Sequence, residues 1–121
     1  DWYVRQQGLK NSHFRTMTAM SRGETPGPES SINKVVSATK YQDISFFGME
    51  MQEMAGIMTD PEEVAMDSLF QTGAMSSPGY RIAGGTDEIL RNIIAERVLG
   101  LPQDVRLDKE GAFRDLPTGR D

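Results

Sequence analysis

Cysteine is absent from this 121-residue sequence, and histidine occurs only once, as His13. The absence of cysteine excludes disulfides, thiolate ligation of zinc or iron–sulfur clusters, and a cysteine nucleophile. A single imidazole gives no support to a histidine-based metal site or a catalytic triad. We therefore expect His13 to be a packed, hydrogen-bonded residue of a core or a subunit interface.

Long hydrophobic runs and an excess of basic residues are missing as well. No apolar run approaches the roughly 18 residues of a membrane span, and we expect no signal peptide. Lys and Arg number 13 against 18 Asp and Glu, which gives a net charge of −5. Because nucleic acids and anionic membranes bind basic patches, we expect neither as a partner, and we expect a soluble, cytoplasmic protein.

Strand-like alternation of apolar and polar residues is a third absence, and a helical period dominates instead. Apolar residues recur at helical spacing in three segments, at about 2–21, 28–56 and 86–99. Pro28 is suited to the first turn of the second segment, and Gly100 is a stop signal for the third. These patterns predict three main helices.

The regions outside these helices are less regular. Pro61-Glu62-Glu63 is a plausible start for a short helix, whereas the Gly73–Gly79 stretch, which includes Pro78, is typical of a loop. Residues 103–121 are charged and poor in large apolar side chains, which predicts a flexible C-terminal tail. The sequence predicts an all-α fold whose central helix needs partners from missing sequence or from another subunit.

The most informative segment is Arg81-Ile82-Ala83-Gly84-Gly85-Thr86-Asp87-Glu88-Ile89. Gly84 and Gly85 precede a helix whose free N–H groups attract anions, and a threonine there can cap the helix or contact a phosphate. The acidic pair Asp87 and Glu88 opposes an anion at the same place. From these residues alone, a glycine turn with an N-cap is the favoured interpretation.

Two long motifs resemble those of acyl-CoA dehydrogenases and occur in that family's order. Arg22-Gly23-Glu24-Thr25-Pro26-Gly27-Pro28-Glu29-Ser30-Ser31-Ile32-Asn33-Lys34 is similar to a turn between two helices of the family's C-terminal bundle. The run Ile82–Pro102 is similar to the family's C-terminal helix. The likeness implies that residues 1–102 are a C-terminal helical domain, an incomplete up-and-down bundle. Because Asp1 is not a methionine, we expect a fragment of a longer protein.

The resemblance implies an oxidoreductase of fatty acid or lipid metabolism. Such flavoproteins use FAD to remove two hydrogens from the α and β carbons of an acyl-CoA. A carboxylate takes the α proton, the flavin accepts the β hydride, and electrons pass to an electron-transfer flavoprotein. We therefore expect an acyl-CoA substrate and a homo- or hetero-oligomer, dimer or tetramer, with FAD in the full-length assembly.

The position of the catalytic base departs from the family's usual pattern. Many members have Glu-Gly-Thr in the final motif, and Gly84 stands here where their glutamate base would be. We therefore assign no catalytic residue to this chain. The base belongs to a helix upstream of Asp1, as in members with Gly-Gly-Thr, or the subunit has no base and pairs with a catalytic one. The sequence leaves these alternatives open.

The cofactor and substrate residues of the family match in part. Thr86 and Glu88 stand at the family's Thr-x-Gln, which contacts FAD, with a carboxylate replacing the amide. Gly85 matches the glycine beside the thioester. The family's Gln-x-x-Gly-Gly, which reaches the flavin nucleotide of a neighbouring subunit, falls near Glu53–Ile57, where both the Gln and the second Gly are lost. The loss of the Gln and of the second Gly argues against FAD binding across that interface.

Other polar and sulfur-containing residues have ordinary structural interpretations. Lys34 is expected to be solvated or in a salt bridge, and Arg91 is expected to pair with Asp87 at i,i+4. A run of methionines is expected to form helix core or subunit packing, with the wall of an acyl pocket as the alternative. These methionines are Met49, Met51, Met54 and Met58.

The leading hypothesis is the C-terminal domain of an FAD-dependent acyl-CoA dehydrogenase, inactive as a fragment and without its own base. The alternative is a non-catalytic partner subunit of a heteromeric dehydrogenase that serves assembly. The third hypothesis is a helical interaction module that has kept the fold of the family and lost its chemistry. The acyl chain of the substrate is not encoded in these motifs.

Overall fold

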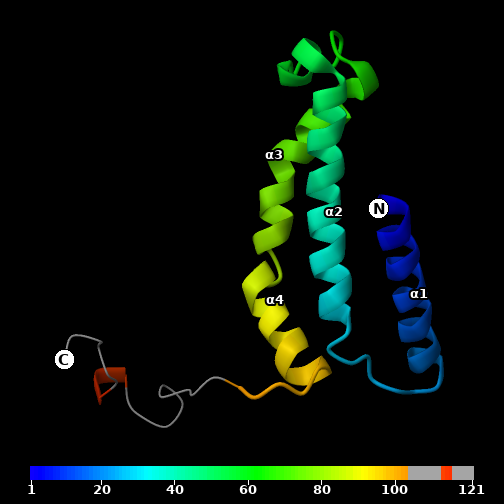
Figure 1. Ribbon diagram of the computed structural model, residues 1–121, viewed down its shortest axis with the longest axis vertical. Coiled ribbons are helices and arrows are strands. Elements are labelled where there is room, and N and C mark those ends of the chain that lie inside the picture. Colours follow the sequence, from blue (N-terminus) through cyan, green and yellow to red (C-terminus); the bar gives the residue numbers. More distant parts are fainter. Residues whose placement is uncertain (104–112, 116–121) are drawn as a thin grey trace.

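The computed structural model describes residues 1–103 and 113–115, and all regular structure within them is helical (Figure 1). Thus the all-α prediction is confirmed. The elements, in chain order, are α1 (Trp2–Ser21), α2 (Ser30–Met51), η1 (Glu53–Ile57), η2 (Ala65–Ser68), α3 (Leu69–Ile82), α4 (Asp87–Ile93), the π-helical turn η3 (Ile94–Val98) and η4 (Phe113–Asp115). Within these ranges no helix is long and apolar enough to cross a membrane.

Helix α2 is the central element and contacts each of the other three helices. It runs antiparallel to α1 on one side and to α3 and α4 on the other, where α3 and α4 follow one another along its length (Figure 1). This arrangement confirms the up-and-down topology. A fourth helix, α3, joins the three that the periodicity predicts.

The α2–α3 contact is close because small residues line it. A Cβ added at Gly73 would overlap the hydroxyl of Ser45, and one added at Gly48 would overlap the ring of Phe70. Ser77, in the same contact, has an exposed fraction of 0%. Glycine therefore occurs at positions where a side chain of the facing helix occupies the space that a Cβ would need.

The predicted loop over Gly73–Gly79 is wrong, since these residues form the middle of α3. Pro78 lies inside the helix, where it has no N–H to offer the carbonyl of Ala74. The buried hydroxyl of Ser77 donates to that carbonyl at 3.0 Å instead. The helix tolerates the proline because a neighbouring side chain replaces the missing hydrogen bond.

Two predicted boundaries are also wrong. Helix α2 ends at Met51, five residues before the expected end, because Glu53 has a φ of 51° and starts the separate turn η1. It begins at Ser30, so Pro28 lies in the preceding turn, where its carbonyl accepts from the N–H of Ser31 at 3.0 Å.

No helix starts at Pro61. Residues 61–63 form a turn in which the Asp60 carboxylate accepts the N–H of Glu62 at 3.0 Å. The chain then reaches α3 through three consecutive left-handed residues, Met66–Ser68, with φ values of 59°, 53° and 58°. The predicted tail, 103–121, lies almost entirely outside the described residues and stays a prediction.

Helix α1 is attached to α2 mainly through its N-terminal half. The Trp2 and Phe47 rings meet edge to face, with centroids 5.0 Å apart, and Arg5 bonds the Asp43 carboxylate at 3.0 Å. No residue of α1 is buried. His13 is exposed, so the prediction that it packs in a core is wrong for this chain, and its packing at a subunit interface stays a prediction.

The buried apolar core of the described residues is small and centred on α2. Its members are Val35, Ala38, Val64, Ala74 and Leu90.

Gly73 is buried in the contact between α2 and α3. We predict that Gly73→Ala destabilises the protein by about 1–3 kcal/mol, because the added methyl overpacks the contact with Ser45. Thermal or denaturant unfolding measures the change.

Gly79→Ala, on the same helix, is the matched control. A Cβ there meets no atom within 4 Å, so the substitution should stabilise α3 by about 0.5–1 kcal/mol. Equal effects of the two substitutions would contradict close packing at Gly73.

Candidate functional site

The turn between α3 and α4 carries two glycines in the left-handed region, as the sequence predicts for a glycine turn before a helix. Gly84 has a φ of 69° and Gly85 a φ of 108°, so a side chain at either position would be strained. A Cβ at Gly84 would meet no atom within 4 Å. The turn exposes bare backbone, which a ligand can approach closely.

Thr86 caps α4, as predicted. Its backbone is extended, and its hydroxyl oxygen accepts the N–H of Ile89 at 3.4 Å. Asp87 and Glu88 both lie in the first helical turn, where their negative charge complements the helix dipole.

Asp87 is buried, with an exposed fraction of 4%, and it pairs with Arg81. The Arg81 Nε and Nη2 atoms lie 2.7 and 2.6 Å from Asp87 Oδ2, and Nη1 donates to Gln42 on α2 at 2.8 Å. The predicted pairing of Asp87 with Arg91 is therefore wrong. Asp87 faces α3 and α2, whereas Arg91 is exposed on α4.

Lys34 of α2 binds both sides of the glycine turn. Its ammonium donates to the carbonyl of Gly85 at 2.7 Å and to that of Arg81 at 3.1 Å. The prediction of a solvated or salt-bridged Lys34 is wrong, because the side chain is partly buried and binds backbone carbonyls. We call Lys34, Gln42, Arg81 and Asp87 the turn clamp.

Glu88 is exposed and carries negative charge in front of the turn. The pKa of Glu88 is lowered because its own backbone N–H and then the Thr86 hydroxyl donate to its carboxylate, with a smaller contribution from the Arg81 guanidinium. Thr86 and Glu88 therefore lie together, as their spacing predicts. Their arrangement does not suit a diphosphate, since the hydroxyl is engaged and the carboxylate would repel the ligand.

The second predicted flavin contact, Glu53–Ile57, forms η1 at the far end of α2 from α4 (Figure 1). Gly56 is needed there, because a Cβ would overlap the carbonyl of Met49. Placed one residue earlier, the Gln-x-x-Gly-Gly pattern keeps Gln52 and Gly56 and has Ala55 at the first glycine. The register that begins at Glu53 conceals this match. The signal for the better register is Gln52, which directly precedes Glu53 in the sequence.

Gln52 is held in a buried amide pair. Its Oε1 accepts from Gln71 Nε2 at 2.8 Å, while its own Nε2 is buried and has no hydrogen-bond partner among the described residues. An unpaired buried donor lowers the stability of the fold by about 1–3 kcal/mol. The Nε2 group of Gln52 can therefore still donate to a further acceptor.

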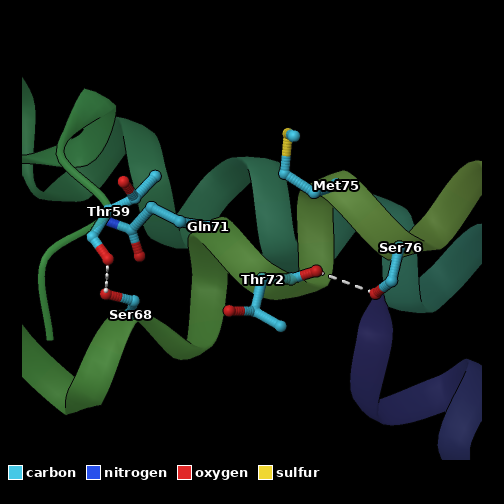
Figure 2. A pocket seen from close by; sticks show the side chains of 6 residues that line it. All are labelled: Thr59, Ser68, Gln71, Thr72, Met75 and Ser76. Carbon is cyan, nitrogen blue, oxygen red and sulfur yellow. Dashed lines mark hydrogen bonds between the residues drawn. The ribbon is translucent and has the colours of Figure 1, made fainter.

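A cavity of about 330 Å³ lies beside α3 (Figure 2). Figure 2 shows the hydroxyls of its two serines turned to backbone carbonyls: Ser68 donates to the carbonyl of Thr59 at 3.0 Å and Ser76 to that of Thr72 at 2.8 Å. Met75 is the apolar member of the lining, which consists of Thr59, Ser68, Gln71, Thr72, Met75 and Ser76.

The predicted methionine run does not line this cavity. Met51 and Met54 are 70% and 78% exposed, so they form no core within this chain, and the core prediction is wrong for them. Their packing against another subunit stays a prediction.

We predict that Arg81→Met destabilises the protein by about 3 kcal/mol, because it leaves the Asp87 carboxylate buried without its partner. Denaturant unfolding measures the loss. Arg91→Met is the control, and should change stability by less than about 0.5 kcal/mol as an exposed substitution. A larger loss of stability at Arg91 than at Arg81 would indicate that Asp87 pairs with Arg91 at i,i+4 instead.

Comparisons with known proteins identify the relatives of the chain. The family model described as "Acyl-CoA dehydrogenase, C-terminal domain" matches residues 1–99. Acyl-CoA dehydrogenase IpdE1 of Mycolicibacterium smegmatis is 37% identical over 100 residues, which cover 83% of this chain and 24% of the relative. Acyl-CoA dehydrogenase FadE34 of Mycobacterium tuberculosis is 33% identical over 81 residues, which cover 67% of this chain and 10% of the relative. No solved structure matches the chain significantly.

Proposed function

The chain belongs to the acyl-CoA dehydrogenase family, and we propose that it acts as the C-terminal helical domain of an FAD-dependent enzyme that oxidises an acyl-CoA. The chain spans about a quarter of the length of the first relative and a tenth of the second, so the complete reaction involves further domains. In this reaction a base would remove the α proton of the thioester. Thr86 and Glu88 stand at the family's FAD-contacting positions, and FAD held there would supply the hydride acceptor, with an electron-transfer flavoprotein as its oxidant.

The observation that carries the proposal is the Gly84–Gly85 turn at the family-matched position, in which Gly84 is exposed and Gly85 half-buried. Both glycines have positive φ, and no side chain fills the space around Gly84, so a flat ligand can approach the peptide groups closely. In this role Gly85 lies beside the thioester, and Thr86 stands at the family's FAD-contacting position, where the ionised Glu88 opposes a diphosphate. The turn clamp holds this part of the chain from the side of α2 and α3.

The proton-abstracting group comes from outside this chain. Gly84 has no side chain, Asp87 is buried against Arg81, and the lowered pKa of Glu88 makes its carboxylate a weaker base than an ordinary glutamate. The chain therefore contributes a wall of the site and the helix packing that supports it, while a carboxylate of a preceding helix or of a partner subunit takes the proton.

The proposal is tested on the protein purified as its complete assembly. Addition of acyl-CoA without oxygen should bleach the visible flavin absorbance, because electrons move from the thioester to the bound flavin. A preparation without flavin, or one whose flavin no acyl-CoA reduces, would contradict the proposed reaction.

Glu88→Gln should lower the dissociation constant for FAD about fivefold, because it removes a negative charge near the expected diphosphate and restores the family's amide. Fluorescence titration of the flavin-stripped assembly measures it. Glu24→Gln, an exposed carboxylate between α1 and α2, is the charge-matched control. Equal constants for both variants would place Glu88 away from the cofactor.

A second candidate function, a non-catalytic partner subunit of a heteromeric dehydrogenase, is favoured by Gly84 and Glu88 together. The first removes the usual base, and the second puts a carboxylate where the family has an amide. This function predicts that the chain co-purifies with a homologous subunit and that FAD binds only to the pair. A fully active homo-oligomer would exclude it.

A further inference from the structure

Lys34 contacts the glycine turn at both of its ends. Gly85, whose carbonyl lies 2.7 Å from the Lys34 ammonium, is the second glycine of the turn. Arg81, whose carbonyl lies 3.1 Å away, belongs to the last turn of α3. These two carbonyls flank the three residues 82–84. A single side chain of α2 therefore connects the end of one helix to the residue just before the cap of the next.

The turn needs such a contact because its own residues cannot hold it. Gly84 and Gly85 have the widest backbone freedom of any residue type, and a Cβ at Gly84 would have no neighbour within 4 Å. Arg81 and Asp87 join α3 to the first residue of α4, but their ion pair contacts neither glycine. Lys34 is the member of the turn clamp that contacts the glycine pair directly.

Holding the Gly85 carbonyl also fixes a hydrogen-bond donor. The peptide between Gly85 and Thr86 is planar and trans, because no cis peptide occurs among the described residues. In a trans peptide the C=O and N–H point in opposite directions. Since the carbonyl points at Lys34 on α2, the N–H of Thr86 points away from α2.

We propose that Lys34 is a positioning residue for acyl-CoA oxidation: by binding the Gly85 carbonyl it orients the Gly85–Thr86 peptide at the thioester. The proposal rests on the proposed function. Lys34 does not touch substrate; it acts through Gly85 and Thr86. Misplacing a group that lines a reacting centre by about 1 Å can cost about a hundredfold in rate. Positioning of this kind affects turnover more than binding.

The same contacts also stabilise the C-terminal end of α3, where a cation meets the negative end of the helix dipole. A structural role alone would lower the melting temperature and leave turnover per bound flavin unchanged. The two roles are therefore separated by rates normalised to flavin content, together with a local measurement on the turn.

The experiment compares three variants in the complete assembly. Lys34→Met removes the donor and keeps the length of the side chain, Lys34→Arg keeps a donor, and Lys40→Met is the control. Lys40 lies on the same helix but hydrogen-bonds Gln6 of α1, away from the turn. The measurements are kcat and KM for an acyl-CoA, flavin content, and hydrogen exchange of residues 84–89.

Lys34→Met is expected to lower kcat per flavin 10- to 100-fold, to change KM less than about threefold, and to speed exchange of 84–89 about tenfold. Lys34→Arg should recover part of kcat, and Lys40→Met should match the unmodified protein. Unchanged exchange after Lys34→Met would overturn the proposal. Faster exchange with unchanged kcat would also overturn it, because the role is then structural only.

Failure of the proposed function is distinguished by the unmodified assembly itself. If acyl-CoA does not bleach its flavin, the reaction is wrong and the positioning role falls with it, while the exchange data still report whether Lys34 holds the turn. If the unmodified assembly is active and only the Lys34 result is negative, the proposed function stands and the positioning role is refuted.

Discussion

The close approach of α2 and α3 determines where the rest of the molecule lies. At Gly73 and Gly48 a side chain of the facing helix occupies the space that a Cβ would need, and this close contact brings the end of α3 alongside the N-terminal half of α2. The glycine turn follows at once, within reach of Lys34, and α4 continues along the same face of α2. A wider separation of the two helices would leave the lysine too far from the carbonyls that it binds.

Charge is distributed unequally across the turn. The cations lie on the side that faces α2 and α3. Lys34 binds backbone carbonyls and Arg81 binds the buried Asp87, so both positive charges are already paired with groups of the fold. The exposed front carries Glu88, whose lowered pKa keeps it ionised under more acidic conditions than an ordinary glutamate. The side that a ligand would meet is therefore acidic, although the N-terminus of a helix ordinarily attracts anions.

Helices with a regular apolar period and clear end signals were predictable, and this is why α1 and α4, the Thr86 cap and the glycine turn agree with the structure. Helix α3 was not, because Gly73, Ser77 and Pro78 favour a loop locally, and only packing against α2 and the Ser77 hydrogen bond make a helix of them. Lys34 has no sequence signal: its partners are main-chain carbonyls 47 and 51 residues away.

The loose attachment of α1 links the protein's stability to its associations. This helix buries none of its residues, and it exposes Tyr3, Val4, Phe14, Met17 and Met20. A separate subunit that covers this face binds the folded helix and not the unfolded one, so it stabilises α1 by mass action. The melting temperature of such an assembly then rises with protein concentration, and dilution alone weakens the N-terminal part of the bundle.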